Sequence, residues 1–288
     1  MINVMKFRPL FLFISLSLIL VSTISIIKWN FVKGIDFVGG TVWEIKFSVP
    51  VDQKKIENIF SGQNIKINTI SLADNTANIK FQPISNDAKT ALDTEIAKLD
   101  PKYTELRFET LGPSLGRELL QKTIMAVILS SFFLLLFIGS RFKDVTFGLA
   151  AILAMFHDTF ILIGAFSVLG HFFGAELDSL FVTALLTTLS ASVHDTVVTF
   201  DRIRELKRKN IKIEWVTLAN TAVSEVIVRS INNSMTIIFM LLALVVLGGD
   251  TTRWFAMALL IGVICGTYSS TGVAIPLVLF FKSIKKKS

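Results

Sequence analysis

Two histidine–aspartate pairs interrupt apolar stretches of the sequence, His157–Asp158 and His194–Asp195. Imidazole and carboxyl groups bind and release protons, and their surroundings decide at which pH they do so. A further ionisable residue, Arg229, lies just before another apolar stretch. Ionisable side chains inside a membrane are costly, and they pair with one another or line the path of an ion. These five residues are the candidates for ion coupling.

The lengths of the apolar stretches place both aspartates inside a membrane. A helix from Leu180 to Val193 would cover only about 21 Å of a hydrocarbon core of about 30 Å. Continuing it to Phe200 gives about 31 Å, so Asp195 is expected inside the span, about 8–10 Å from its end. Asp158 and the histidine before it have about eleven residues on either side, which predicts a position near the bilayer midplane.

Arg229 is expected to be the counter-charge of Asp195, because the span that follows must reach back to it for a full crossing. The alternative is an arginine that reaches the membrane surface along its apolar stem. For both Asp195 and Asp158, the alternative to carrying an ion is a purely structural role. The sequence identifies no partner for Asp158. His194 points about 100° round the helix from Asp195 and is expected to tune the pH response.

Neither a metal centre nor a catalytic centre is expected. One metal ion would need both His–Asp pairs to converge from two helices, and nothing else supplies a ligand. The serines of the apolar stretches lack the spacing of a nucleophile elbow or a catalytic triad. We therefore expect no metal, no cofactor and no enzymatic activity.

The composition is that of an integral membrane protein with a modest soluble part. Of the 288 residues, 52% are hydrophobic and 18% are charged, and the mean hydropathy is +0.64, whereas soluble domains have about 25% charged residues. Six stretches reach or approach the length of a spanning helix, residues 9–27, 120–139, 146–169, 180–200, 228–247 and 254–281. The first is expected to be an uncleaved span, because no small-residue cleavage site closes it.

The basic residues predict the orientation of the spans. With the N-terminus in the cytoplasm, nearly all Lys and Arg residues next to the spans lie on the cytoplasmic side, and the short outer loops hold only Arg253. Both termini are then cytoplasmic, and in a bacterium the segment from residue 28 to 118 is periplasmic. This distribution also explains the net charge of +7 without nucleic acid as a partner. The expected division is a first transmembrane helix at 1–27, a periplasmic domain at 28–118 and a five-helix transmembrane domain at 119–288.

The segment 28–118 is predicted to fold as a small α+β domain of the order β-α-β-β-α-β, the ferredoxin-like plan. Asp52 and Ser85 are expected to cap its two helices. Asp74 and Asn75 form a turn pair suited to a tight hairpin between the second and third strands.

Glycines mark two further regions. Those flanking the soluble domain are candidates for hinges or close backbone approach, with tight turns that never move as the alternative. Those in the sixth span form a small-xxx-small pattern that favours close helix packing. The first set is Gly39, Gly40, Gly112 and Gly116, and the second is Gly262 and Gly266.

Six blocks of the sequence together resemble the SecF family, the smaller membrane subunit of the SecD–SecF complex of bacterial protein export. In chain order they are GIDFVGGT, LGPSLGRELL, HDTFILIGAF, HDTVVTFDRIRE, VRSINNS and GTYSS. The resemblance covers essentially the whole chain, and it implies the RND superfamily, with six spans forming an RND-like half. It also implies that Asp195 and Arg229 take part in proton flow. The family usually has asparagine where this chain has His194.

The resemblance implies a function late in secretion. The chain would act with SecD beside the SecYEG channel in the inner membrane and use the proton-motive force, without ATP, to draw the exported preprotein outwards. Two alternatives stay open, a component of an RND-type small-molecule transporter and a passive structural subunit of the translocon. Besides SecD, SecYEG and the preprotein, membrane lipid is the expected partner.

Overall fold

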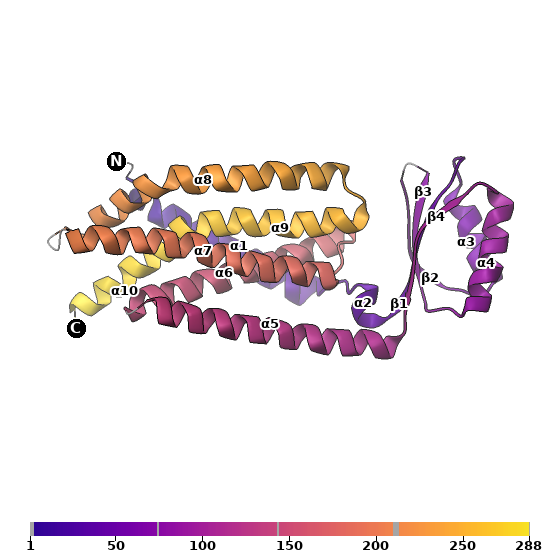
Figure 1. The fold of residues 1–288 in the computed structure, drawn as a ribbon, viewed down its shortest axis with the longest axis horizontal. Coiled ribbons are helices and arrows are strands. Elements are labelled where there is room, and N and C mark those ends of the chain that lie inside the picture. The colour runs from indigo at the N-terminus through magenta and orange to yellow at the C-terminus, as the bar shows by residue number, and fades with distance from the viewer. Residues whose placement is uncertain (1–2, 74, 143, 210–212, 288) are drawn as a thin grey trace. The chain divides into compact units, whose positions relative to one another are not determined.

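The computed structural model describes residues 3–287 apart from 74, 143 and 210–212, and it describes their side chains except at 250–251 and 285–287. The chain forms two compact units. One comprises Met1–Val32 and Ala126–Ser288, and the other comprises Lys33–Met125. The first unit is helical and the second contains the four strands described (Figure 1).

Among the described residues, six helices are long and apolar enough to cross a membrane, and they confirm the predicted spans. In chain order these are α1 (Arg8–Trp29, after the short helix η1 at Val4–Phe7), α5 (Pro113–Arg141), α6 (Val145–Phe173), α7 (Ser179–Lys209), α8 (Trp215–Leu247) and the segment α9 (Asp250–Ser269) to α10 (Ile275–Lys287). Helix α5 begins at Pro113, five residues before the expected end of the soluble domain, because proline is favoured at the first position of a helix.

Helices α6, α7 and α9 contact one another and form the interior of the helical unit, with α1 against α6 and α8 against α9. Both chain termini lie at the same end of this unit (Figure 1). Helices α5 and α8 expose rows of large apolar side chains, among them Phe132, Phe133, Phe239 and Met240. Such rows are expected where lipid or another membrane protein covers a helix.

The sixth span contains an irregularity that the sequence did not predict. Residues Ser270–Ala274 form a π-helical segment between α9 and α10. Pro276 follows it, and proline has no N–H to donate to the carbonyl oxygen of Gly272. This lost bond is a physical reason for the local rearrangement of the helix, and such segments occur often at functional sites.

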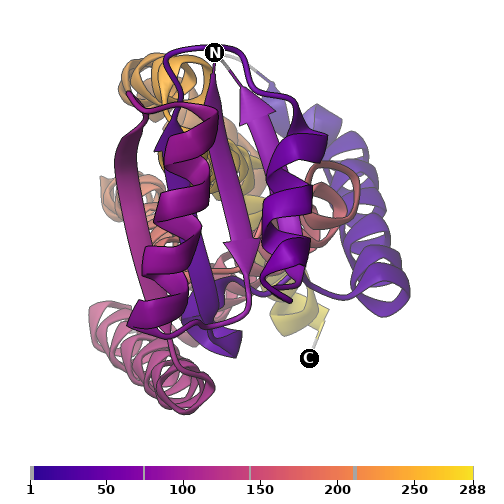
Figure 2. The same cartoon turned by 90° about the vertical axis from the view of Figure 1, so that its right-hand side faces the viewer.

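The second unit is a four-stranded sheet covered on one face by two helices (Figure 2). Its strands are β1 (Gly40–Lys46), β2 (Ile67–Ala73), β3 (Thr76–Phe81) and β4 (Thr104–Leu111), and its helices are α2 (Ile35–Val38), α3 (Gln53–Gly62) and α4 (Asn86–Leu99). The spatial order is β2-β3-β1-β4, with every neighbouring pair antiparallel. This confirms the predicted β-α-β-β-α-β plan, which the short helix α2 precedes.

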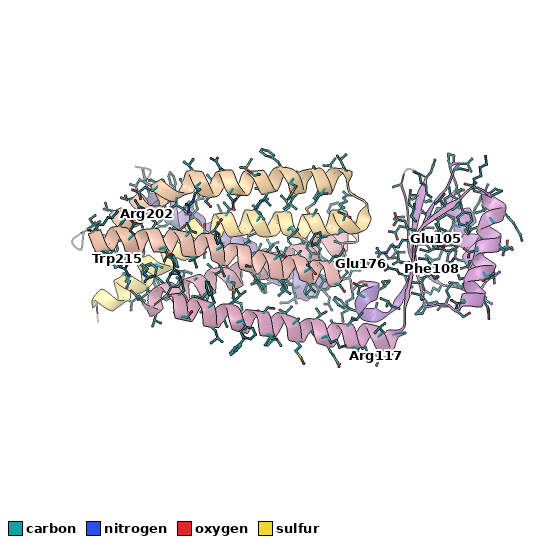
Figure 3. The ribbon with its side chains drawn as sticks, viewed as in Figure 1. Glu105, Phe108, Arg117, Glu176, Arg202 and Trp215 are labelled. Carbon is teal, nitrogen blue, oxygen red and sulfur yellow. The ribbon has the colours of Figure 1, made fainter. Side chains whose placement is uncertain are left out.

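The predicted alternation along β1 gives the core of this unit. Trp43 and Ile45 are fully buried, and Phe47, just beyond the strand, is nearly so. The indole Nε1 of Trp43 donates to Glu105 Oε2 at 2.9 Å, and the Trp43 ring meets that of Phe108 edge to face at 6.0 Å. Figure 3 labels Glu105 and Phe108 in this sheet unit.

The predicted helix caps of this unit are confirmed. Asp52 accepts from the Lys54 N–H at 3.1 Å, and Ser85 accepts from the Ala88 N–H at 3.3 Å. The sequence predicts the hairpin turn at Asp74 and Asn75, of which Asp74 lies outside the described residues. Asn75 has a φ of 62°, the left-handed conformation that such a turn requires.

Asp100 ties the end of α4 to the chain that leaves β1. Its carboxylate accepts from the backbone N–H groups of Ser48 at 2.6 Å and Lys102 at 2.9 Å, and from the Ser48 hydroxyl at 2.8 Å. Burial by itself would raise the pKa of Asp100, but these hydrogen bonds favour the carboxylate and lower the pKa below its ordinary value. The unit is therefore stabilised by the charged form of this side chain.

Candidate ion-coupling site

Helix α7 carries Asp195 without a break, so the prediction that it continues past His194 is confirmed. Hydroxyl groups along it find acceptors within the helix, as when Thr199 donates to the carbonyl oxygen of Asp195 at 3.1 Å. Thr196 donates in the same way to the carbonyl oxygen of Ser192 at 3.0 Å. Such internal bonds satisfy polar side chains where no water is present.

Asp195 lines a cavity of about 550 Å³ between α7, α8 and α9. The side chain is half-buried, and its Oδ2 accepts a hydrogen bond of 3.2 Å from the hydroxyl of Ser230 on α8. His194, which is exposed, and the two packing glycines of the sixth span, Gly262 and Gly266, line the same cavity. The structure thus brings four of the predicted residues to one place.

Arg229 does not form the expected ion pair with Asp195. Its side chain is exposed, and the next residue, Ser230, supplies the direct contact instead. Adjacent residues on a helix point about 100° apart, so only one of the two can face α7. The guanidinium lies near enough to act on Asp195 through its charge, but it is not a bonded partner.

Asp158 has partners that the sequence did not reveal. Its Oδ2 accepts from the hydroxyls of Ser192 on α7 at 2.6 Å and Ser269 on α9 at 2.5 Å. Its Oδ1 lies 2.9 Å from Nδ1 of His157. The carboxylate is therefore held by side chains from three helices, α6, α7 and α9.

His157 is buried beside Asp158, with the residue only 8% exposed. Its second ring nitrogen, Nε2, is buried and has no hydrogen-bond partner among the described atoms. The described residues contain no group of three or more His, Cys, Asp or Glu residues that could hold a metal ion. The site as described can bind protons and small polar species through hydroxyl, imidazole and carboxyl groups.

Residues 91–284 match the family model of the protein export membrane protein SecD/SecF, C-terminal region. The chain belongs to the SecD/SecF family. The protein translocase subunit SecF of Thermobaculum terrenum is 38% identical over 94% of this chain and 90% of its own length. This places the chain among the membrane subunits of protein export.

The larger relative SecDF joins the SecF-like part to further sequence. The protein translocase subunit SecDF of Thermus thermophilus is 34% identical over 89% of this chain, which spans 36% of that protein. A crystal structure of SecDF from the same species, described as a translocon-associated membrane protein, matches 98% of this chain with a TM-score of 0.86 and 31% identity. This chain spans only 39% of that structure, so it corresponds to one part of SecDF.

The sequence interpretation missed the serines that bond to these two aspartates. Ser192 and Ser269 donate hydrogen bonds to Asp158, and Ser230 donates one to Asp195. The sequence did indicate that Ser192 lies near the site, because it is three residues before Asp195 and therefore on the same side of α7. What could not be seen was that this serine bonds an aspartate on another helix.

Gly262 and Gly266 permit the close packing of α9 on α7. A Cβ added at Gly262 would lie 2.0 Å from Cγ2 of Thr188, and one at Gly266 would lie 3.3 Å from Cα of Ser192. The backbones therefore approach at the point where Ser192 meets Asp158. Packing, the simpler of the two interpretations, accounts for this pair.

The glycines of the soluble unit differ among themselves. Gly39 and Gly40 have φ of 80° and 152°, which L-residues rarely adopt. A Cβ at Gly116 would lie 2.9 Å from the backbone nitrogen of Gly39, which identifies a close approach. Gly112 has neither property, since the nearest atom to its Cβ would be the Ser114 hydroxyl at 3.9 Å. The backbone of Gly112 lies close to Gly39, with its carbonyl carbon 3.0 Å from a Cβ added at Gly39, but this approach does not require a glycine at 112, whose role as a hinge stays a prediction.

Charged and aromatic side chains gather at the end of the helical unit that holds the termini, where Figure 3 labels Arg202 and Trp215. Arg202 Nε donates to Glu225 at 2.5 Å, and Lys282 forms an ion pair with Asp144. Burial alone would raise the pKa of Asp144, but Lys282 and the N–H of Thr146 donate to it and lower the pKa below its ordinary value. This end thus keeps its charges paired, unlike the cavity around Asp195.

Proposed function

We propose that the chain is the SecF subunit of a bacterial SecD–SecF complex that couples the proton-motive force to late, ATP-independent translocation of preproteins through SecYEG. One observation carries the proposal. Asp195 lies inside a membrane-length helix and lines a cavity, and among the described residues it has a hydroxyl partner but no ion pair. A carboxyl in this position can change its charge, which a charge fixed by a salt bridge cannot do as readily.

The coupling follows from the cost of charge in a membrane. The free energy of the charged carboxylate depends on the water and on the charges around it. A movement that opens or closes the cavity therefore changes how tightly Asp195 binds a proton, and by linkage proton binding favours one of the two arrangements. Arg229 contributes its charge from a distance, and His194, at the exposed edge, tunes the pH range of the exchange.

SecD is the proposed membrane partner. In Thermus SecDF the part that matches this chain is joined to a longer remainder of the same protein. The exposed apolar rows of α5 and α8 would lie against SecD or membrane lipid. The alternative of a small-molecule transporter component has no comparable support, since the relatives described above are translocase subunits.

The proposed orientation follows the basic residues. Both termini and the paired charges around Arg202 face the cytoplasm of the inner membrane, and the sheet unit faces the periplasm. The sheet unit is the proposed moving part, which meets the emerging preprotein or the outer domain of SecD. Gly39 and Gly40, whose backbone angles L-residues resist, and the close contact at Gly116 are its candidate hinge.

The test is Asp195→Asn, which keeps the shape of the side chain and removes its charge. The variant is produced with SecD in a strain that lacks its own SecF, and preprotein export is measured with and without an uncoupler. We expect the uncoupler-sensitive part of export to disappear while the complex with SecD is recovered in normal amount. Glu205→Gln, an exposed carboxylate on the same helix, is the matched control and should export normally.

Full uncoupler-sensitive export by Asp195→Asn would overturn the proposal and leave the passive structural subunit as the better description. Reduced export together with loss of the complex would point to the same alternative. The control separates loss of this carboxylate from loss of any negative charge on α7.

A further inference from the structure

The second buried carboxylate, Asp158, is bonded in a way that allows two charge states. The hydroxyls of Ser192 and Ser269 donate to it, and Nδ1 of His157 lies 2.9 Å from its Oδ1, so it has the partners of an ionised carboxylate, which only accepts hydrogen bonds. Ser269 Oγ also lies 3.3 Å from the carbonyl oxygen of Gly266. When Asp158 is protonated, the Ser269 hydroxyl can turn its hydrogen to Gly266 and accept from the carboxyl group. Both states are then satisfied without movement of the backbone.

The charged groups around Asp158 allow the His157–Asp158 pair to gain and lose one proton. Among the described residues, the titratable groups around it are His157 on α6 and Cys265 and Tyr268 on α9, while α7 contributes the Ser192 hydroxyl. Helix α1 contributes the Ser15 hydroxyl, which bonds Tyr268 at 2.9 Å, while Lys282 of α10 bonds Asp144 instead. Among the described residues no Lys or Arg pairs with Asp158. An ionised carboxyl beside a neutral imidazole gives the His157–Asp158 pair a charge of −1, and adding one proton makes the pair neutral.

His157 has one ring nitrogen that the pair does not satisfy. The side chain is 6% exposed, and its Nε2 is buried without a partner among the described atoms. A buried polar atom left without a hydrogen bond is costly, and a proton added to Nε2 would be a buried N–H without an acceptor. The added proton is therefore placed on Asp158, whose Oδ2 has two hydroxyl partners.

We propose that His157 and Asp158 form a second proton-binding site, connected to the Asp195 cavity by the Ser192 hydroxyl. Ser192 lines that cavity and donates to Asp158. A protonated group or a water in the cavity gives its proton to Ser192 Oγ as the serine passes its own proton to Asp158 Oδ2. The serine is neutral before and after, the donor loses one proton, and Asp158 gains one. The link to export rests on the proposed function, whereas proton binding by the pair does not.

The site adjoins the irregular part of the sixth span. Ser269, which changes its acceptor between the two states, is the last residue of α9, and the π-helical segment Ser270–Ala274 follows it directly. Protonation of Asp158 reverses the bond between Ser269 and Asp158 and turns the hydroxyl hydrogen to Gly266, so it changes the side-chain bonding at this junction while the backbone stays in place.

The test is infrared difference spectroscopy of the full chain in complex with SecD in lipid vesicles, as the pH is lowered. The C=O stretch of a protonated carboxyl reports each buried aspartate. We expect Asp158→Asn to lose one such band, and Asp195→Asn to lose a different one. An Asp158→Asn spectrum identical to wild type would overturn the inference.

A second variant tests the role of Ser192 without removing the carboxyl. In Ser192→Ala the Asp158 band should remain, with its midpoint moved by about one pH unit to higher pH, because the charged form loses one donor. Ser167→Ala removes another fully buried hydroxyl of the helical unit, one that bonds Asn30 instead, and should leave the band unchanged. An unmoved midpoint in Ser192→Ala, or an equal shift in both variants, would contradict the assignment.

The outcome is separable from that of the proposed function. If Asp195→Asn exports normally while the Asp158 band is present and shifts with Ser192→Ala, the proton site stands and the export mechanism falls. If Asp195→Asn abolishes uncoupler-sensitive export while no band depends on Asp158, the export mechanism stands and this inference falls.

Discussion

Substituting Gly262 by alanine tests whether the approach of α9 to α7 holds the site together. The added Cβ would lie 2.0 Å from Cγ2 and 2.6 Å from Cβ of Thr188, whereas carbon atoms in contact are about 3.5–4.0 Å apart. Rotating Thr188 would move Cγ2 but not Cβ, and it would disturb the 2.9 Å bond from its hydroxyl to the carbonyl oxygen of Leu185. The helices must therefore separate by about 1 Å.

The energetic balance favours destabilisation. Overpacking costs about 1–3 kcal/mol, and replacing glycine by alanine in a helix returns about 0.5–1 kcal/mol. The difference lies between about 0 and 2.5 kcal/mol, and its upper end corresponds to a Tm lower by roughly 5–10 °C. Uncoupler-sensitive export should fall as well, because the separation of α7 from α9 moves apart Ser192 and Ser269, which both bond Oδ2 of Asp158.

The assay is thermal unfolding of the purified complex with SecD, followed by tryptophan fluorescence. Gly139→Ala is the matched control, since its Cβ would meet nothing within 4 Å, and its Tm should be unchanged or slightly higher. Adding Thr188→Ala to Gly262→Ala removes Cγ2 but keeps Cβ, so it should restore part of the loss. A Gly262→Ala protein that melts at or above the wild-type temperature would refute the close packing of these helices.

Two further predictions concern the sheet unit. Asp100→Asn should make the stability of the sheet unit less dependent on pH in the acid range. The pKa of Asp100 in the native state lies below the unfolded value of about 3.9. The carboxylate therefore stabilises the unit fully above the unfolded pKa, and this contribution is lost as the pH falls through the native pKa. Amide hydrogen exchange of β1 and α4 in the full chain measures this, and an unchanged pH profile in the variant would contradict it. Gly116→Ala should destabilise the unit by roughly 1–3 kcal/mol through its contact with Gly39, whereas Gly112→Ala, with its nearest atom at 3.9 Å, should not. Limited proteolysis of the two variants side by side decides, and equal resistance would count against the close approach.

Local periodicity and length determined most of the fold in advance. The spans follow from apolar runs long enough to cross a bilayer, and the sheet unit follows from alternation such as that of Trp43 and Ile45. The caps at Asp52 and Ser85 were predictable because a cap acts within three residues of its own position. Each of these features depends on neighbours in sequence, and a single sequence contains that information.

The partners of the buried aspartates depend on the rotation of whole helices, which apolar sequence leaves undetermined. Ser230 of α8 faces α7 in the structure. If α8 were rotated by 100° about its axis, Arg229 would face α7 instead, and the apolar run after these residues is compatible with either rotation. Asp158 is a stronger case, because its contacts come from residues 34 and 111 positions away in the sequence. No spacing rule connects such positions, so the sequence predicted the depth of each aspartate but not what holds it.

The kind of partner that the structure provides bears on what the aspartates can do. An arginine bonded to Asp195 or Asp158 would fix the carboxylate in its charged form, since removing that charge leaves the arginine unpaired in a medium of low dielectric. A serine hydroxyl donates to a carboxylate and accepts from a carboxyl group, so it costs little in either state. Ser230 serves Asp195 in this way, and Ser269, with Gly266 as its second acceptor, serves Asp158. Buried acids held by hydroxyl groups from neighbouring spans are therefore suited to gaining and losing a proton. A serine that faces an intramembrane aspartate is a better indication of a proton-binding site than an oppositely charged residue at the same depth.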